Sequence, residues 1–186
     1  MNMNINLKDF LADDVNIIEI FFCKDSSGSL GTSENSVINV NISSDIESII
    51  EKKYKKYKEE KYKSYHYKDK VYTYELSNDN QYVSSKIMTK TKYMKHNESG
   101  LFVLSCKIDK FPQYIFPCTN EIDNISIYTI KEFKINNRIS LMLRTDYTNN
   151  EEVAKSFNIE YRHSPNVEID KINEYINNII ATYINC

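Results

Sequence analysis

Apolar and polar residues alternate with a period of two through much of this chain, and the alternation is clearest between Ile125 and Arg162. Two alternating runs there are joined by Asn136-Asn137, a pair that tolerates the positive φ angles of a two-residue type I′ turn. The sequence therefore predicts a β-hairpin in which Phe133 pairs with Ser140. A third strand is expected over residues 156–162.

This register sorts the side chains of the hairpin onto two faces, because successive residues of a strand point to opposite sides. One face is expected to carry Lys131, Phe133, Arg138, Met142, Arg144 and Asp146, and the other Tyr128, Ile130, Ile139, Leu141 and Leu143. In the third strand, Asn158, Glu160 and Arg162 share a face. All the arginines of the chain fall in this region, so its charged face is the best candidate for a polyanion site.

The rest of the chain adds more strands and two helices. Period-two runs recur from Val71 to Ile108, and residues 15–22 form a dense run of β-formers. Ser43-Ser44-Asp45 is expected to cap a helix, and an apolar stripe over 167–184 predicts another at the C-terminal end. With 41% hydrophobic and 12% aromatic residues, we expect one folded α+β domain over residues 1–186, antiparallel and β-rich, with these two main helices.

The segment 52–70 is rich in lysine and tyrosine and allows two interpretations. Cations among aromatic rings suit an arm that binds single-stranded RNA. The favoured interpretation is the solvated end of a helix running into a strand, with Glu59 and Glu60 paired to lysines. Asn, Ile, Lys and Tyr are abundant throughout, which indicates an AT-rich genome and lowers the weight of any cluster of lysines.

Whole-chain properties exclude several classes of function. The net charge of −2 gives no overall attraction to nucleic acid. The first residues lack the pattern of a signal peptide, and no apolar stretch approaches the ~20 residues that span a bilayer. The scattered cysteines and histidines lack zinc spacing, and the common nucleotide-binding and hydrolase motifs are absent. We therefore expect no membrane association, and a cytoplasmic location.

Two glutamates stand out because apolar residues surround them. Glu19 lies in NIIEIFF and Glu160 in SFNIEYR. An unpaired charge among apolar neighbours costs several kcal/mol, so each carboxylate needs a cation or a metal ion as a partner, unless its face of the strand is simply wet. Both interpretations remain open from the residues alone.

The order of these segments resembles the tunnel-fold, metal-dependent RNA 5′-triphosphatases, especially the capping-enzyme domains of large DNA viruses. In that family an early strand carries metal-binding glutamates, middle strands carry basic residues, and a late strand with a second E-x-E precedes a helix. The corresponding segments here are NIIEIFF, then TKTKYM and YTIKEFKINNRISLMLR, then SFNIEYRHSPNVEIDKINEYINNII.

The resemblance implies a closed β tunnel or barrel in a viral protein of the host cytoplasm or the virion. It implies Glu19 and Glu160 as ligands of Mg²⁺ or Mn²⁺ if the protein is an enzyme, and otherwise no cofactor. The implied phosphate-binding residues are Lys90, Lys131, Arg138 and Arg144. The substrate or ligand would be an RNA 5′ end or a nucleoside triphosphate.

Phe21 and Asn158 depart from the family pattern, because they stand where it expects glutamates. Fewer carboxylates weaken metal binding, so catalysis is expected to be reduced or lost. Two functions therefore remain open. One is a triphosphate-tunnel protein that acts on or binds polyphosphate, and the other is a non-enzymatic β-rich viral protein that works through a protein–protein interface.

Overall fold

The computed structural model describes residues 4–12, 14–22, 44–68, 70–96, 101–111, 122 and 124–184. The strands in this part of the chain are β1 (Ile17–Phe22), β2 (Lys58–Tyr67), β3 (Lys70–Leu76), β4 (Tyr82–His96), β5 (Leu101–Phe111), β6 (Asn124–Lys134), β7 (Ile139–Thr148) and β8 (Glu151–Arg162). The helices are the 3-10 helix η1 (Leu7–Phe10), α1 (Ser44–Lys53) and α2 (Ile169–Ile184).

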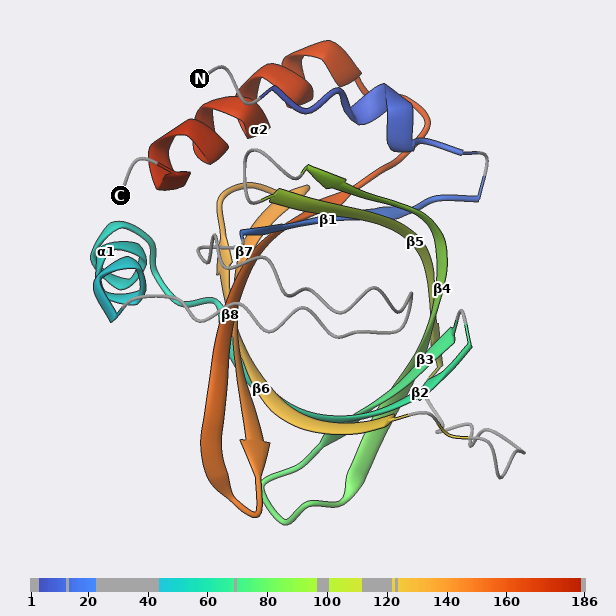
Figure 1. Cartoon of the computed structure of the whole chain (residues 1–186), viewed down its shortest axis with the longest axis vertical. Coiled ribbons are helices and arrows are strands. Elements are labelled where there is room, and N and C mark those ends of the chain that lie inside the picture. The colour runs from blue at the N-terminus through green and yellow to red at the C-terminus, as the bar shows by residue number, and fades with distance from the viewer. Residues whose placement is uncertain are drawn as a thin grey trace.

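The strands form one closed antiparallel barrel in the order β1-β5-β4-β3-β2-β6-β7-β8, and β1 pairs with both β5 and β8. Closure gives every strand a partner on each side, so the sheet has no free edge. Figure 1 looks along the ring of strands, with α2 and η1 against one side and α1 beside β8, all of them outside the ring. The predicted α+β, antiparallel fold with a closed barrel and two main helices is confirmed.

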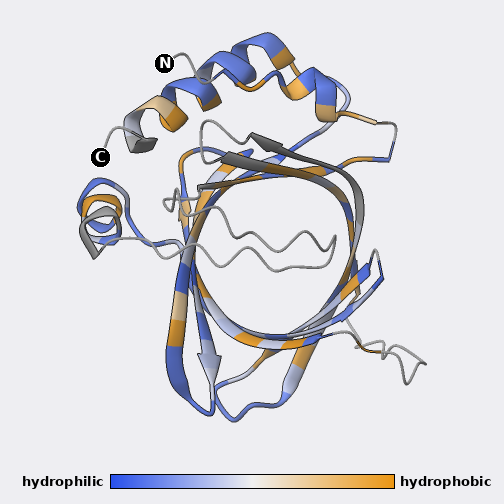
Figure 2. Ribbon diagram, in the orientation of Figure 1, coloured by the Kyte–Doolittle hydropathy of each residue, from blue (hydrophilic) through white to orange (hydrophobic). Residues whose placement is uncertain are grey.

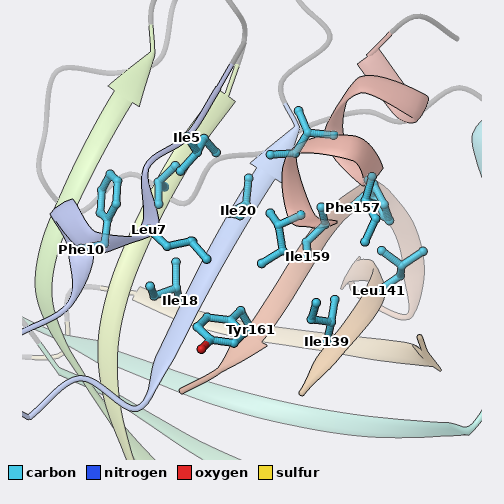
Figure 3. Packing of buried hydrophobic residues seen from close by; sticks show 14 of the residues in the cluster. Ile5, Leu7, Phe10, Ile18, Ile20, Ile139, Leu141, Phe157, Ile159 and Tyr161 are labelled. Carbon is cyan, nitrogen blue, oxygen red and sulfur yellow. The ribbon is translucent and has the colours of Figure 1, made fainter. Parts of the chain in front are cut away.

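The main apolar core lies outside the ring, between the barrel wall and the helices. It joins residues of β1, β7 and β8 to η1 and α2, among them Ile18, Ile20, Ile139, Leu141, Phe157, Ile159, Tyr161, Leu7, Phe10, Ile176 and Ile180. Figure 3 shows the isoleucines of β1 and β8 on the side of the sheet that faces η1 and α2. Burying each such side chain stabilises the fold by about 1.5–3 kcal/mol.

Asparagines fasten the N-terminal segment to α2. The side chain of Asn177 accepts a hydrogen bond from the backbone N–H of Ile5 (2.8 Å) and donates one to its carbonyl (2.9 Å). Asn173 accepts from the N–H of Leu7 at 2.8 Å. These side chains give the segment the backbone partners that a neighbouring strand would supply, and hold it over β1.

The position of the core decides which side chains point into the barrel. Residues that alternate with the core residues face the interior, because successive side chains of a strand lie on opposite faces. Figure 2 shows hydrophobic and hydrophilic residues mixed along the strands of the barrel wall. Several buried polar side chains lie on the interior face: Ser64, Thr73, Glu132, Ser140, Ser156, Asn158 and Glu160. The interior is therefore mixed, with charged and polar side chains beside apolar ones such as Ile17, Leu104 and Met142, whereas the face that the helices cover is apolar.

The β6–β7 hairpin is displaced by one residue from the predicted register. Phe133 pairs with Leu141, not with Ser140, and Lys131 pairs with Leu143. Lys131 and Phe133 therefore lie on the outer face, and the prediction that they share a face with Met142 and Arg144 is wrong.

The predicted turn is wrong for a local reason. Asn136 and Asn137 keep negative φ angles, and the side chain of Asn136 instead accepts hydrogen bonds from the N–H groups of Arg138 (2.8 Å) and Ile139 (2.9 Å). The positive φ angles of a I′ turn occur at Asn149 and Asn150, at 53° and 66°, in the two-residue connection between β7 and β8.

Other segments follow the sequence closely. The predicted C-terminal helix is α2, and the helix expected after Ser43 is α1. The lysine–tyrosine segment confirms the helix-to-strand order of the favoured interpretation, because α1 ends at Lys53 and β2 begins at Lys58, although Lys58 and Glu60 face the interior and not the solvent. Its glutamates pair with lysines as expected, in Lys56–Glu59 (2.7 Å) and Lys58–Glu60 (2.6 Å). Among the described residues, no helix is long and apolar enough to cross a membrane.

Candidate functional site inside the barrel

The two glutamates singled out from the sequence are neighbours in the interior. Glu19 of β1 pairs directly with Glu160 of β8, and such partners have Cβ atoms about 5 Å apart. Glu160 is 8% exposed and pairs on its other side with Ser140 of β7. Phe21 and Asn158, the two departures from the E-x-E pattern, pair with each other in the same way. The structure thus brings Glu19 and Glu160 together.

Arg162 links Glu160 to a third carboxylate, that of Glu132 on β6. Its Nε donates to Oε1 of Glu160 at 2.8 Å, and its Nη2 donates to Oε1 of Glu132 at 3.1 Å. The hydroxyl of Ser140 donates to the same oxygen of Glu132 at 2.7 Å. Burial would lower the pKa of Arg162, but the two carboxylates outweigh this effect and raise that pKa above its ordinary value.

The chain of alternating charges continues onto β2. The ammonium group of Lys58 lies 3.6 Å from Oε2 of Glu132 and 2.6 Å from Oε2 of Glu60. The hydroxyl of Tyr62 also donates to Glu60. Burial opposes ionisation of Glu60, yet hydrogen bonds from Lys58 and Tyr62 lower its pKa below the ordinary value. Burial, with help from Glu60, raises the pKa of Tyr62, so its hydroxyl keeps its proton.

A second cationic group in the interior is centred on Arg144 of β7. Its guanidinium binds Asp146 through Nη2 at 2.5 Å and through Nε at 3.0 Å. The guanidinium carbon lies 3.7 Å from the ring centroid of Tyr128, which stacks on Tyr62 at 5.6 Å. The Nζ atom of Lys86 lies 5.1 Å from the ring centroid of Tyr62. The two aromatic rings therefore hold both cations in defined positions.

Two of the other predicted phosphate-binding residues, Lys131 and Arg138, do not join Arg144. Lys131 lies on the outer face and binds Glu47 (3.3 Å) and Glu51 (2.9 Å) of α1. Arg138 lies in the loop after β6, where its Nη1 donates to the hydroxyl of Ser164 at 2.5 Å. Lys90 belongs to β4 and pairs with Cys106, and its side chain lies outside the described part of the structure.

Sequence reasoning missed several interior charges. Glu132 was hidden by the one-residue error in register, which placed Lys131 where Glu132 stands. Lys58 and Glu60 were taken for the solvated end of a helix, since every residue of KEEK is charged and shows no alternation. Lys86 lies in one of the predicted strands, and nothing in the sequence indicates a partner for it. Correct pairing of β6 with β2 is the signal that would have placed Lys58 and Glu60 on the same face as Glu132.

The described residues do not fit a divalent metal ion in this arrangement. They contain no group of three or more His, Cys, Asp or Glu side chains placed to hold one. Mg²⁺ and Mn²⁺ need oxygen ligands that converge at about 2 Å, whereas Glu160 and Glu132 each spend an oxygen on Arg162. Phe21 and Asn158 supply no carboxylate.

No protein-family model and no curated protein matches this chain. Among solved structures, it is similar to the Mimivirus capping enzyme triphosphatase, with a TM-score of 0.61 and 13% identity over 95% of this chain and 92% of that chain. It is also similar to S. pombe Pct1 RNA triphosphatase, solved in complex with the Spt5 CTD, with a TM-score of 0.52 and 10% identity over 96% of this chain and 81% of that chain. For the PH1012 protein of Pyrococcus horikoshii OT3, the TM-score is 0.50 and the identity 16%, over 89% of this chain and 90% of that chain. The resemblance expected from the sequence is confirmed at the level of the fold: this chain has the tunnel fold seen in RNA triphosphatases.

Proposed function

We propose that this protein binds polyphosphate, and RNA 5′-triphosphate ends in particular, inside its barrel, with catalysis reduced or lost. The observation that carries the proposal is the inner wall of the closed barrel. Arg144, Arg162, Lys58 and Lys86 reach this wall from four strands, in a fold shared with RNA triphosphatases.

The interior arginines suit phosphate because each guanidinium already binds a carboxylate, whose place a phosphate group can take. Arg144 holds Asp146 with two nitrogens, and the same fork of N–H groups matches two phosphate oxygens. An entering phosphate would exchange with the carboxylate, so the guanidinium keeps an anionic partner throughout. The ring of Tyr128 supports its orientation during this exchange. Lys90 remains a candidate, whereas the outward placement of Lys131 and the loop position of Arg138 favour leaving them out.

Reduced catalysis follows from the carboxylates. Glu19 and Glu160 remain the candidate metal ligands, with Mg²⁺ or Mn²⁺ as the cofactor if hydrolysis occurs. Phe21 and Asn158 remove two potential ligands, and Arg162 engages Glu160. A protein built in this way favours retention of the triphosphate over its cleavage.

Binding to two RNAs that differ at the 5′ end tests the proposal. A 5′-triphosphorylated oligonucleotide and its 5′-hydroxyl counterpart of the same sequence would be titrated in a fluorescence anisotropy assay. We expect preference for the triphosphate, and a loss of about tenfold or more in its affinity on Arg144→Gln, because a charge-assisted hydrogen bond is removed. Lys131→Gln is the matched control and should leave the affinity unchanged. Equal affinity for the two RNAs would contradict the proposal and favour the protein–protein interface.

Phosphate release tests the second half of the proposal. The purified protein would be incubated with triphosphorylated RNA or ATP in the presence of Mg²⁺ or Mn²⁺, beside Glu160→Ala. We expect little or no release. Release that needs metal and disappears in Glu160→Ala would make the protein an active hydrolase and correct the claim of reduced catalysis. Circular dichroism would show that each variant is folded.

A further inference from the structure

Arg162 stands where one cation neutralises two carboxylates from different strands. Its guanidinium contacts Glu160, two residues earlier on β8, and also Glu132 on β6, with β7 between the two strands. We infer that Arg162 is a built-in counter-cation that replaces a divalent metal ion between Glu160 and Glu132. It keeps the free protein from binding Mg²⁺ or Mn²⁺ at these carboxylates.

Burial shows that Glu132 needs such a cation. Its side chain is 1% exposed, so water cannot stabilise the charge. Ser140 and Arg162 donate to Oε1, but Oε2 makes no hydrogen bond to any described residue, and the nearest cation is Lys58 at 3.6 Å. A buried carboxylate oxygen without a hydrogen bond is rare, and it points into the interior beside Arg162.

The donor set would suit a divalent ion once the guanidinium is removed. Glu160 and Glu132 would each regain an oxygen, and Glu19 is the direct cross-strand partner of Glu160. Carboxylate oxygens are the ligands that Mg²⁺ and Mn²⁺ prefer in proteins. Glutamine in place of Arg162 is shorter, keeps two N–H donors of the five and carries no charge. Arg162→Gln should therefore convert the ion pairs into a divalent-cation site.

Manganese retention measures this directly, in the absence of any polyphosphate. Mn²⁺ would be titrated into the wild type, Arg162→Gln, Arg144→Gln and the double variant Glu160→Gln/Arg162→Gln, with free ion followed by electron paramagnetic resonance. Arg144→Gln is the matched control, because it also removes an interior arginine, but one that binds Asp146 on its own strand and does not bridge described carboxylates of two strands. We expect about one ion retained by Arg162→Gln and none by the other three chains.

Thermal unfolding gives a second readout on the same samples. A ligand that binds the folded state raises Tm, so Arg162→Gln should gain about 5 °C or more when Mn²⁺ exceeds its Kd about a hundredfold. The wild type should change by no more than about 1 °C. Mg²⁺ in place of Mn²⁺ should give the same order among the chains.

Two results would overturn the inference: one Mn²⁺ retained by the wild type, or a folded Arg162→Gln that retains none. If Arg162→Gln folds only when Mn²⁺ is present, that dependence supports it. If the variant does not fold at all, the wild type decides, since retention refutes the inference and free Mn²⁺ upholds it. RNA binding is not needed for any of these results, so the proposed function and this inference can fail separately.

Discussion

At the scale of single residues, Glu132 is the charge whose surroundings are most fully determined by the fold. It is almost completely buried, yet it contacts a hydroxyl on β7, a guanidinium on β8 and an ammonium on β2. Removing one partner of a buried ion pair destabilises a protein far more than removing an exposed pair, because the remaining charge loses its counter-ion. Removing Glu132 should therefore destabilise the folded state, because its partners Arg162 and Lys58 stay charged and lose a counter-ion.

We expect Glu132→Ala to lower the free energy of unfolding by roughly 2 kcal/mol or more, somewhat below the effect of a fully isolated buried charge because Arg162 keeps Glu160. Glu59→Ala, on the adjacent strand, is the matched control. Glu59 and Lys56 are both exposed, so it should cost less than about 1 kcal/mol. Urea unfolding of the two variants and the wild type would measure both effects. Equal losses in the two variants would show that the interior network adds nothing to stability.

At the scale of elements, the dipeptide Asn-Asn occurs in two hairpins and takes two different conformations. Between β6 and β7 the side chain of Asn136 bonds the following backbone, and between β7 and β8 both asparagines have positive φ angles. The local sequence did not distinguish them. The register that forms buries Phe133 beside Leu141 in the outer core, whereas the predicted one would have placed Phe133 inside with Arg144. Packing against the helices therefore overrides turn preference.

Alanine substitution would separate the two turns. A positive φ angle costs an ordinary residue about 1 kcal/mol more than it costs asparagine or glycine, so Asn149→Ala/Asn150→Ala should lower the free energy of unfolding by about 1–2 kcal/mol. Asn137→Ala, at a negative φ angle, should be close to neutral. Chemical unfolding of both variants is the measurement. A larger loss from Asn137→Ala would contradict the assigned turn.

Among its described side chains, the helix α1 is attached to the barrel by the buried Ile50 and by a group of ion pairs. Ile50 is fully buried, and Glu47 binds both Lys155 of β8 (2.8 Å) and Lys131 of β6 (3.3 Å). The hydrogen bond from Lys155 is the largest influence on the pKa of Glu47. Burial opposes it and Lys131 reinforces it, and together they lower this pKa below its ordinary value of 4.5.

The direction of this shift predicts a pH dependence. As pH falls, the unfolded chain takes up the proton on Glu47 before the folded one does, so the contribution of Glu47 is complete above about pH 5 and is lost at lower pH. The difference in unfolding free energy between wild type and Glu47→Gln should therefore shrink between pH 5 and pH 3. Urea unfolding across that range checks it, with the exposed Glu174→Gln as control. A difference that stays constant with pH would contradict the assigned role.

At the scale of the whole molecule, alternation in the sequence predicted the strands and the faces of β7 and β8, because each has one apolar and one polar side. It did not predict the interior face of β2, because the first four residues of that strand, Lys58 to Lys61, are all charged and therefore show no alternation. Which of these charged side chains face the interior is decided only when the barrel closes, and closure depends on pairing between strands that are far apart in the sequence. The family resemblance implied that Glu19 and Glu160 lie together, whereas the link that Arg162 makes between Glu160 and Glu132 required the structure.

The closing strand, β1, has a consequence for how the protein is made. It precedes every other described strand in the sequence, and one of its two partners, β8, follows all the others and is synthesised after them. Contacts between such distant segments make folding slow, and β1 cannot pair with β8 until β8 has been synthesised. Glu160 and Arg162 both belong to β8. A chain that ends before β8 therefore cannot close the barrel and lacks Glu160 and Arg162. The closed barrel and its interior charge network are thus expected to form together, after β8 has been synthesised.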